Sequence, residues 1–557
     1  MVTGRALVAG AIVGAGGLYL LSLMIGLWAA YDRWLALPRF ALLSGGALVL
    51  ALYLGTTTAK ATARALFLAT GSGLLAGAIG IFFLLTHNWQ AATPTDFQLL
   101  ATITAWVQGR QPTWAALTGL TPFHFHENAV AGALMVLLPL GGAGWRVQWQ
   151  RQRFGVTVIT GAALLVAIFA LLLTFSRSAW VGLAVATSVA GFTITRATQW
   201  RRLGAFLCGA FLLSLAVITF VIIPDLLNTV VGWLGWQAVG GTVGSRLTVW
   251  QNAVTLVPDY WFTGSGLQST AMVLSSYVYL LHVPYLAHGH NLYLQMALEQ
   301  GAPALVAFGI GAAGLLWLSR AQIAENPLVT GATVGLLALL VYGWFDAELY
   351  SSLLAPLLFL PIGLLAKFSL CALQPRSGRL LFVGSILPVV TILLLAGFIG
   401  LPTLLMVNRV ALQQSRMELS RYAWPAWPLQ DAVRQALPVD FARITAQYRQ
   451  VLAQAPDNVT AQRRLGQILL SQNDVVGAER HLEIAHRLAP GQRATRQLLG
   501  EVYALQGNVE AAERIWQGLD LSQGQLTLRF QWYAETGKFR ELLQLARAAK
   551  RVVARVE

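Results

Sequence analysis

Charged side chains are scarce in this sequence. Asp, Glu, Lys and Arg together make up 11% of the 557 residues, whereas hydrophobic residues make up 56%. So few charges are not enough to cover the surface of a soluble globular protein of this length. The composition therefore excludes that class and indicates a polytopic membrane protein.

Cysteine is scarcer still, with only Cys208 and Cys371 in the chain. Both fall within or at the end of an apolar run, which excludes a disulfide framework and a zinc site. Also missing are a phosphate-binding loop, a Gly-x-Gly-x-x-Gly fingerprint, a His-Glu-x-x-His motif and an Asp-x-Asp pair. We therefore expect no metal, no cofactor and no nucleotide chemistry.

Acidic residues are fewer than basic ones, which gives a formal net charge of +15. The Lys and Arg residues are scattered in short clusters between apolar runs and do not gather on one face. Nucleic acid is therefore not expected as a partner. The basic residues instead set the orientation of the chain in a bilayer.

What the sequence has in abundance is apolar runs, each long enough to cross about 30 Å of hydrocarbon as a helix. We expect an all-α fold in which residues 1–410 form a transmembrane helical bundle of about eleven spans. Two longer loops, at about 87–126 and about 224–290, interrupt the series. The expected spans are 6–30, 40–56, 65–86, 128–145, 155–175, 179–195, 204–223, 292–318, 328–345, 350–368 and 380–406.

The short loops that carry basic residues all fall on one side of this arrangement. They include Arg64, Arg151, Arg201, Arg320 and Arg376. By the positive-inside rule this side is cytoplasmic. Both long loops and everything after residue 406 are then expected on the opposite, extracytoplasmic side.

The C-terminal part changes character from about residue 441 to residue 557. Pro456 and Pro490 stand 34 positions apart, and the same offset relates Gly466 to Gly500. This period is that of the tetratricopeptide repeat, a helix-turn-helix unit that often recruits protein partners. A generic helical hairpin domain is the alternative. Residues 411–440, with Trp424 and Trp427 each followed by Pro, are expected to form an interfacial linker.

Two arginines are candidates for binding an anionic group on the extracytoplasmic side. Arg177 follows an apolar run directly and lies between Ser176 and Ser178, whose hydroxyls could donate to a phosphate. Arg246 follows a Gly-rich stretch and precedes Trp250, and its guanidinium fork matches phosphate oxygens. The alternatives are an arginine that snorkels from a helix end and a solvated loop arginine.

Histidines gather where the second long loop meets a span. His288 and His290 are separated by one glycine, and Asn291 is a good N-cap for a helix from Leu292 onward. We expect His290 on one stripe of that helix, where the helix dipole disfavours its protonated form and keeps it available as a base. A purely structural interfacial histidine is the alternative.

Further polar residues lie at the mouths of other spans. His126 ends the first long loop and is expected on the acceptor side of the cavity or as an interfacial residue. Asp346 and Glu348, at the outer end of another span, are the acidic candidates for orienting a histidine.

At these residues the chain resembles the O-antigen ligase and polymerase superfamily of bacterial envelope glycosyltransferases. The resemblance covers about residues 127–350. Its motifs are Thr174-Phe-Ser-Arg177-Ser-Ala-Trp-Val-Gly182, Ser245-Arg246-Leu-Thr-Val-Trp250, Gly264-Ser-Gly266-Leu, and His290-Asn291 with Gly301 ten residues after the Asn.

The resemblance implies transfer of a polyprenyl-diphosphate-linked glycan to an acceptor hydroxyl at the outer face of the bacterial inner membrane. Arg177 and Arg246 would hold the diphosphate, and His290 would activate the hydroxyl for inverting attack. Ser176, Ser178, His288, Asn291, Trp250, His126 and Asp346 would help to bind substrate. The acceptor is a lipid, a glycan or a protein, and the bilayer and a protein at the repeats are the further partners.

Other functions stay open at this point. A protein O-oligosaccharyltransferase of the same superfamily would use the same site on a protein acceptor. A transporter would need charged or broken spans near the bilayer midplane. A scaffold that anchors the repeats would leave the Arg and His cluster unexplained.

Overall fold

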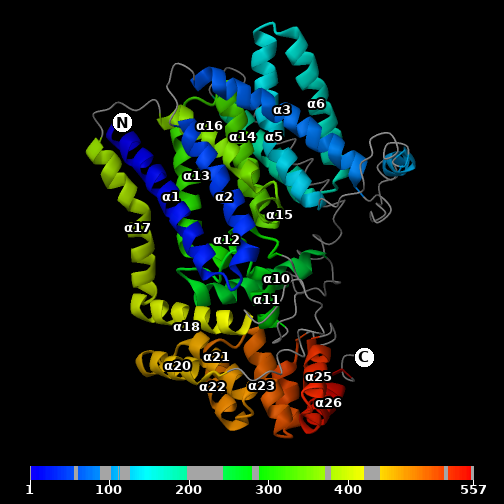
Figure 1. Ribbon diagram of the computed structural model, residues 1–557, viewed down its shortest axis with the longest axis vertical. Coiled ribbons are helices and arrows are strands. Elements are labelled where there is room, and N and C mark those ends of the chain that lie inside the picture. The colour runs from blue at the N-terminus through cyan, green and yellow to red at the C-terminus, as the bar shows by residue number, and fades with distance from the viewer. Residues whose placement is uncertain are drawn as a thin grey trace.

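The computed structural model describes residues 2–54, 61–87, 102–110, 112, 126–196, 242–278, 288–370, 378–419, 440–519 and 525–553 (Figure 1). Every regular element in these ranges is a helix, which confirms the predicted all-α class. The predicted span at 204–223 and the Trp424–Trp427 segment lie outside the described residues.

Seven helices among the described residues are long and apolar enough to cross a membrane. Three further apolar helices accompany them, and the chain is a multi-pass membrane protein. The seven are α1 (Val2–Ala29), α3 (Ala61–Thr86), α5 (Glu127–Gln150), α6 (Phe154–Leu173), α13 (Ala302–Ser319), α14 (Pro327–Phe345) and α17 (Gly378–Ile399). The three are α2 (Arg33–Leu54), α7 (Arg177–Arg196) and α16 (Phe359–Leu370). The count of eleven spans stays a prediction.

Three predicted spans are not single helices. The one at 292–318 breaks at Gly301, where φ is +78° and α12 (Leu292–Gln300) gives way to α13. The one at 380–406 breaks at Gly400, where φ is +103° and α18 (Leu401–Leu419) begins. Glycine adopts these left-handed conformations without the Cβ clash that other residues meet. The span at 350–368 is divided into α15 (Glu348–Ser351), the 3-10 helix η4 (Ala355–Leu358) and α16.

The second long loop is also more ordered than predicted. Its described part forms α10 (Thr242–Leu256), the 3-10 helix η3 (Val257–Tyr260) and α11 (Thr270–Val278). These elements lie beside α12 at one end of the bundle (Figure 1).

Helix packing shows which termini meet at this end. Gly132, near the start of α5, lies against Tyr342, near the end of α14, whereas Gly331 at the start of α14 lies against Pro139. The two helices are therefore antiparallel.

The pair α5 and α6 follows the same rule. Gly141 of α5 lies against Leu164 of α6, and Gly161 of α6 lies against Trp145 of α5, so these helices are antiparallel too. The start of α5, the end of α14 and the turn between α6 and α7 therefore share one end of the bundle.

Below the bundle, α18 runs across the ends of the membrane helices, and the C-terminal helices lie against it (Figure 1). The residue at which we placed the end of the membrane domain, 410, falls inside α18. The C-terminal helices are α20 (Ala442–Gln454), α21 (Val459–Ser471), α22 (Val475–Leu488), α23 (Arg493–Leu505), α24 (Val509–Trp516), α25 (Gln525–Glu535) and α26 (Phe539–Val553).

The 34-residue period of the sequence reappears in these helices. α21 and α23 begin 34 residues apart, and so do α22 and α24. Gly466 lies against Leu482, and Gly500 lies against the Trp516 ring, so a small residue at equivalent positions allows each helix pair to pack closely. Whether these pairs are tetratricopeptide repeats stays a prediction.

Candidate active site

The turn before α12 is the centre of the candidate site. Asn291 caps the helix, because its Oδ1 accepts hydrogen bonds from the backbone N–H groups of Tyr293 and Leu294, both at 3.0 Å. Its Nδ2 donates to the Trp344 carbonyl at 3.0 Å, which ties the turn to the end of α14. The predicted N-cap is confirmed.

The predicted placement of His290 on a stripe of that helix is wrong. His290 precedes the N-cap, and its φ of +49° is left-handed. A residue of a right-handed α-helix has a negative φ, so His290 is not part of α12. A non-glycine residue with a left-handed φ carries backbone strain, which such turns retain only when their surroundings fix them. The Trp250 Nε1 supplies one such contact by donating to the His290 carbonyl at 3.2 Å.

His288 forms an ion pair with Glu348 of α15, and both side chains are largely buried. Burial opposes the charge of each, but the hydrogen bond and the opposite charge raise the pKa of His288 and lower that of Glu348. Asp346 contacts Asn128 and Tyr342 instead, and burial raises its pKa. Of the two acids that we expected near a histidine, Glu348 is therefore the one that contacts it.

His290 lies beside this pair but has the opposite electrostatic character. Its ring centroid is 4.3 Å from that of His288. Burial, and then the nearby charges of His288 and Arg246, lower the pKa of His290 to about 3. The imidazole is therefore neutral near pH 7. Its Nδ1 is buried and has no hydrogen-bond partner among the described residues.

The low pKa of His290 agrees in direction with the sequence prediction but has a different cause. We expected the dipole of α12, whereas burial is the largest contribution. A further consequence is that His290 is a weaker base than predicted in the site as it stands.

Arg246 and Trp250 lie one turn apart on α10 and both reach toward the end of α14 and the histidine turn. Arg246 Nη1 donates to the Phe345 carbonyl at 3.2 Å, which leaves the rest of the half-buried guanidinium without an ion pair among the described residues. Arg246 therefore lies on a helix, whereas we expected it in an irregular part of the second long loop, after the glycine-rich stretch.

Arg177 is the first residue of α7 and is exposed. It directly follows the turn between α6 and α7, and therefore lies at the end of the bundle where α5 begins and α14 ends. Ser176 and Ser178 are buried, and their hydroxyls are bonded to each other at 3.2 Å. One of the two hydroxyl hydrogens remains for another acceptor.

His126 lies at the same end, at the start of α5. Its Nδ1 accepts from the Asn128 N–H at 3.3 Å, and its ring centroid is 6.3 Å from that of His288. The structure thus brings His126, His288, His290, Asn291, Arg246, Trp250 and Asp346 into one contact network. It places Arg177 at the same end without a direct contact to that network among the described residues.

Sequence reasoning missed the polar support beneath the turn. Gln295 Oε1 accepts from the Gly289 N–H at 3.0 Å, and Gln295 Nε2 donates to Glu299 at 2.8 Å. Glu299 is fully buried, with Arg39 of α2 at 3.8 Å and the Tyr350 hydroxyl at 3.0 Å. The four-residue spacing of Gln295 and Glu299 in an apolar helix was the signal that could have found them.

Among the described residues, no three His, Cys, Asp or Glu side chains converge to hold a metal ion. Residues 162–309 match the family model described as O-antigen ligase. The matched segment includes Arg177, Arg246 and the His288–Asn291 turn and ends within α13. No curated protein and no solved structure matches the chain.

Proposed function

Starting from the O-antigen ligase domain that this helical membrane protein carries, we propose that it transfers a glycan from a polyprenyl diphosphate to an acceptor hydroxyl on the extracytoplasmic side. The family is one of glycosyltransferase-type ligases, so the chain is an enzyme of this class. The family match does not specify the donor, the acceptor class or the roles of the residues, and these belong to our proposal.

The observation that carries the proposal is the composition of the site inside the matched segment. A neutral imidazole, whose Nδ1 has no hydrogen-bond partner among the described residues, lies close to the Arg246 guanidinium and to His288, whose pKa is raised. Cations that face a neutral base suit a substrate with an anionic leaving group and a hydroxyl to be activated.

In the proposed reaction the acceptor hydroxyl attacks the anomeric carbon of the glycan as its proton passes to His290. The bond between that carbon and the diphosphate oxygen breaks, and the electron pair leaves with the diphosphate. Arg246 and Arg177 hold the diphosphate and stabilise the charge that develops on it. Of the paired Ser176 and Ser178 hydroxyls, the one whose hydrogen is not used in their mutual bond donates a hydrogen bond to the diphosphate.

The proposal also accounts for a base whose pKa is about 3 in the site as it stands. A bound diphosphate adds negative charge close to Arg246 and His288, two of the groups that lower this pKa. The pKa of His290 then rises toward neutrality when the donor is bound, and the base gains strength only when there is a substrate to use it.

The remaining predicted residues surround the acceptor side. Trp250 and Asn291 fix the strained turn, and Asp346 holds the starts of α5 and α15 through Asn128 and the Glu348 N–H. His126 and His288 face each other beside this turn and would orient the acceptor hydroxyl. The acceptor is a lipid, a glycan or a protein.

The test is glycan transfer by the full-length protein in nanodiscs, supplied with the polyprenyl-diphosphate-linked glycans of its native host. His290→Ala should lower the transfer rate at least about 100-fold, because a general base contributes at least this factor. His486→Ala, in the last turn of α22, is the matched control and should keep the wild-type rate. Wild-type transfer by His290→Ala would refute the assigned base, and no transfer by any form would refute the function.

A further inference from the structure

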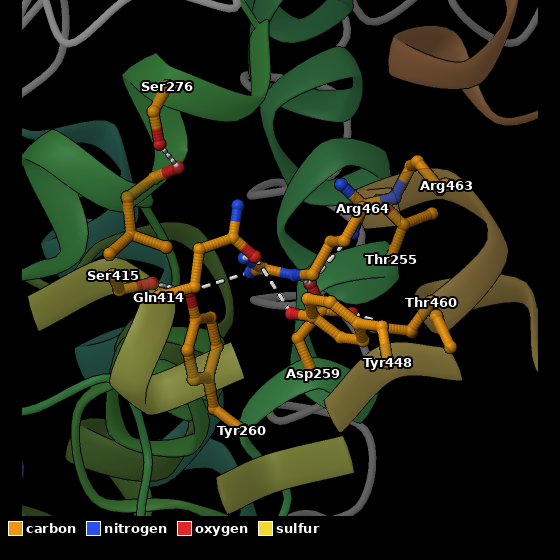
Figure 2. A network of polar contacts seen from close by, with 12 residues as sticks. Thr255, Asp259, Tyr260, Ser276, Gln414, Ser415, Tyr448, Thr460, Arg463 and Arg464 are labelled. Carbon is orange, nitrogen blue, oxygen red and sulfur yellow. Dashed lines mark hydrogen bonds and ion pairs between the residues drawn. The ribbon is translucent and has the colours of Figure 1, made fainter. Parts of the chain in front are cut away.

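The C-terminal helices are attached to the second long loop by a buried ionic cluster, which we call the Asp259 clamp (Figure 2). Asp259 of η3 has no exposed surface, and three residues of α21 contact its carboxylate. Thr460 donates at 2.7 Å, Arg463 at 2.7 Å and Arg464 at 2.8 Å. The two guanidiniums hold the pKa of Asp259 below its usual value even though burial opposes this.

A second layer of polar contacts surrounds Arg464. It donates to the Tyr260 hydroxyl at 2.7 Å and to Gln414 of α18 at 3.0 Å, and Tyr448 of α20 donates to the same Gln414 oxygen at 2.8 Å (Figure 2). Four elements, η3, α18, α20 and α21, therefore meet in one polar cluster that contains Asp259 and Arg464.

This docking uses a face of α21 that a free helical repeat would leave open. Thr460, Arg463 and Arg464, spaced three and four residues apart on this face, are all buried. Charged side chains are almost never buried unless they are paired. The face that a repeat domain would offer to a partner is thus occupied here by the chain's own η3 and α18.

The Asp259 clamp is connected to the candidate site by a short stretch of helix. η3 continues α10 directly, and α10 carries both Trp250, which bonds the His290 carbonyl, and Arg246. On the other side of η3, the Trp261 carbonyl accepts from the Ala302 N–H at 2.8 Å, at the glycine break between α12 and α13. η3 is therefore connected to Arg246 and Trp250 through α10, and to the C-terminal end of α12 through Trp261.

We propose that Asp259 is a positioning residue, and that the C-terminal helices hold it in order to fix α10 and its Arg246 against the His288–Asn291 turn. The catalytic role of this positioning rests on the proposed function, whereas the attachment of α10 by the Asp259 clamp does not. The C-terminal helices are then a permanent part of the catalytic unit, in addition to any partner that their outer faces bind.

The test compares Asp259→Asn with Asp457→Asn in the full-length protein. Asp457 is an exposed acid just before α21, so its substitution removes the same charge without touching the clamp. Hydrogen exchange of Thr242–Leu256 and of the histidine turn should become faster by about tenfold or more in Asp259→Asn, since a charged hydrogen bond is worth at least this factor. Exchange in α5 and α14 should not change, and Asp457→Asn should match the wild type.

A second measurement is the affinity of each variant for undecaprenyl diphosphate. Asp259→Asn should bind about tenfold more weakly, because Arg246 is no longer held in place. If Asp259→Asn does not yield folded protein, Arg463→Gln, which leaves Arg464 on the carboxylate, should show the same pattern to a smaller degree.

Unchanged exchange of α10 in the folded variants, or faster exchange spread evenly over α5 and α14, would overturn the inference. Absence of undecaprenyl diphosphate binding by the wild type would count against the proposed function alone, because the exchange measurement still decides the role of the clamp.

Discussion

His288 and His290 are separated by one glycine, yet their pKa values move in opposite directions. The ion pair with Glu348 raises the pKa of His288, whereas His290 has no ion pair among the described residues and lies close to His288 and Arg246, which lower its pKa. The site thus contains one fixed cation and one neutral acceptor made from the same residue type. This division of roles depends on Glu348 more than on either histidine.

The contribution of the His288–Glu348 pair to stability should depend on pH. The pKa of His288 is raised above 6.5, so its contribution is complete below 6.5 and is lost as pH rises through the folded-state value. The pKa of Glu348 is lowered below 4.5, so its contribution is present above 4.5 and is lost as pH falls. The pair is therefore fully formed between these limits.

Glu348→Gln should accordingly lower the free energy of unfolding by about 2 to 3 kcal/mol near pH 6. The difference from wild type should shrink as the pH rises through the raised folded-state pKa of His288, because the imidazole then loses its charge. Thermal unfolding in detergent over this pH range measures it, with Glu325→Gln at an exposed position as the control. A difference that stays constant with pH would exclude the ion pair as its cause.

Among the elements, the glycine breaks determine where the site forms. Gly264 has a φ of +64°, and a Cβ at this position would lie 2.3 Å from the Glu299 carbonyl carbon at the end of α12. The loop after η3 can approach α12 only because this side chain is absent. Gly301 lies in the same region, because a Cβ at that position would meet the backbone of Trp261 and Phe262 in the turn after η3.

Gly264→Ala should therefore destabilise the protein by about 2 kcal/mol or more, since it adds both a left-handed alanine and an overlap with backbone. Gly309→Ala is the matched control, because a Cβ there meets nothing within 4 Å. Thermal unfolding of the two variants gives the comparison. Equal stability of both would show that the loop can withdraw from α12 without cost.

Sequence reasoning predicted those elements whose position is determined by residues close together in the chain. Asn291 revealed its N-cap by residue type, and the 34-residue period located the helix pairs of the C-terminal part. Sequence reasoning did not predict the helix break at Gly301, because a hydropathy average contains no information on backbone conformation. α10 and η3 were missed because their polar residues look like a loop when their packing partners are unknown.

Over the whole molecule, the site and the C-terminal helices lie at the same end of the bundle (Figure 1). The Asp259 clamp joins them across 204 and 205 residues of sequence, to Arg463 and Arg464 respectively. No local pattern links residues so distant, which is why sequence reasoning left the C-terminal part as a module for outside partners. Both parts must also lie on one side of the membrane.

This shared side is open to labelling. With Cys208 and Cys371 replaced, a cysteine introduced at Asp457 should react with a membrane-impermeant maleimide added to intact cells. One at Gln152, in the exposed turn between α5 and α6, should react only after the membrane is permeabilised, because that turn lies at the opposite end of the bundle. The reverse pattern would place the site on the cytoplasmic side.

A cryo-electron microscopy map of the full-length protein with bound undecaprenyl diphosphate would decide the central proposal. The proposal predicts that both phosphates lie between Arg246 and the Arg177 turn, with His290 Nδ1 facing the position of the anomeric carbon. A diphosphate at the other end of the bundle, or one in contact with neither arginine, would contradict it.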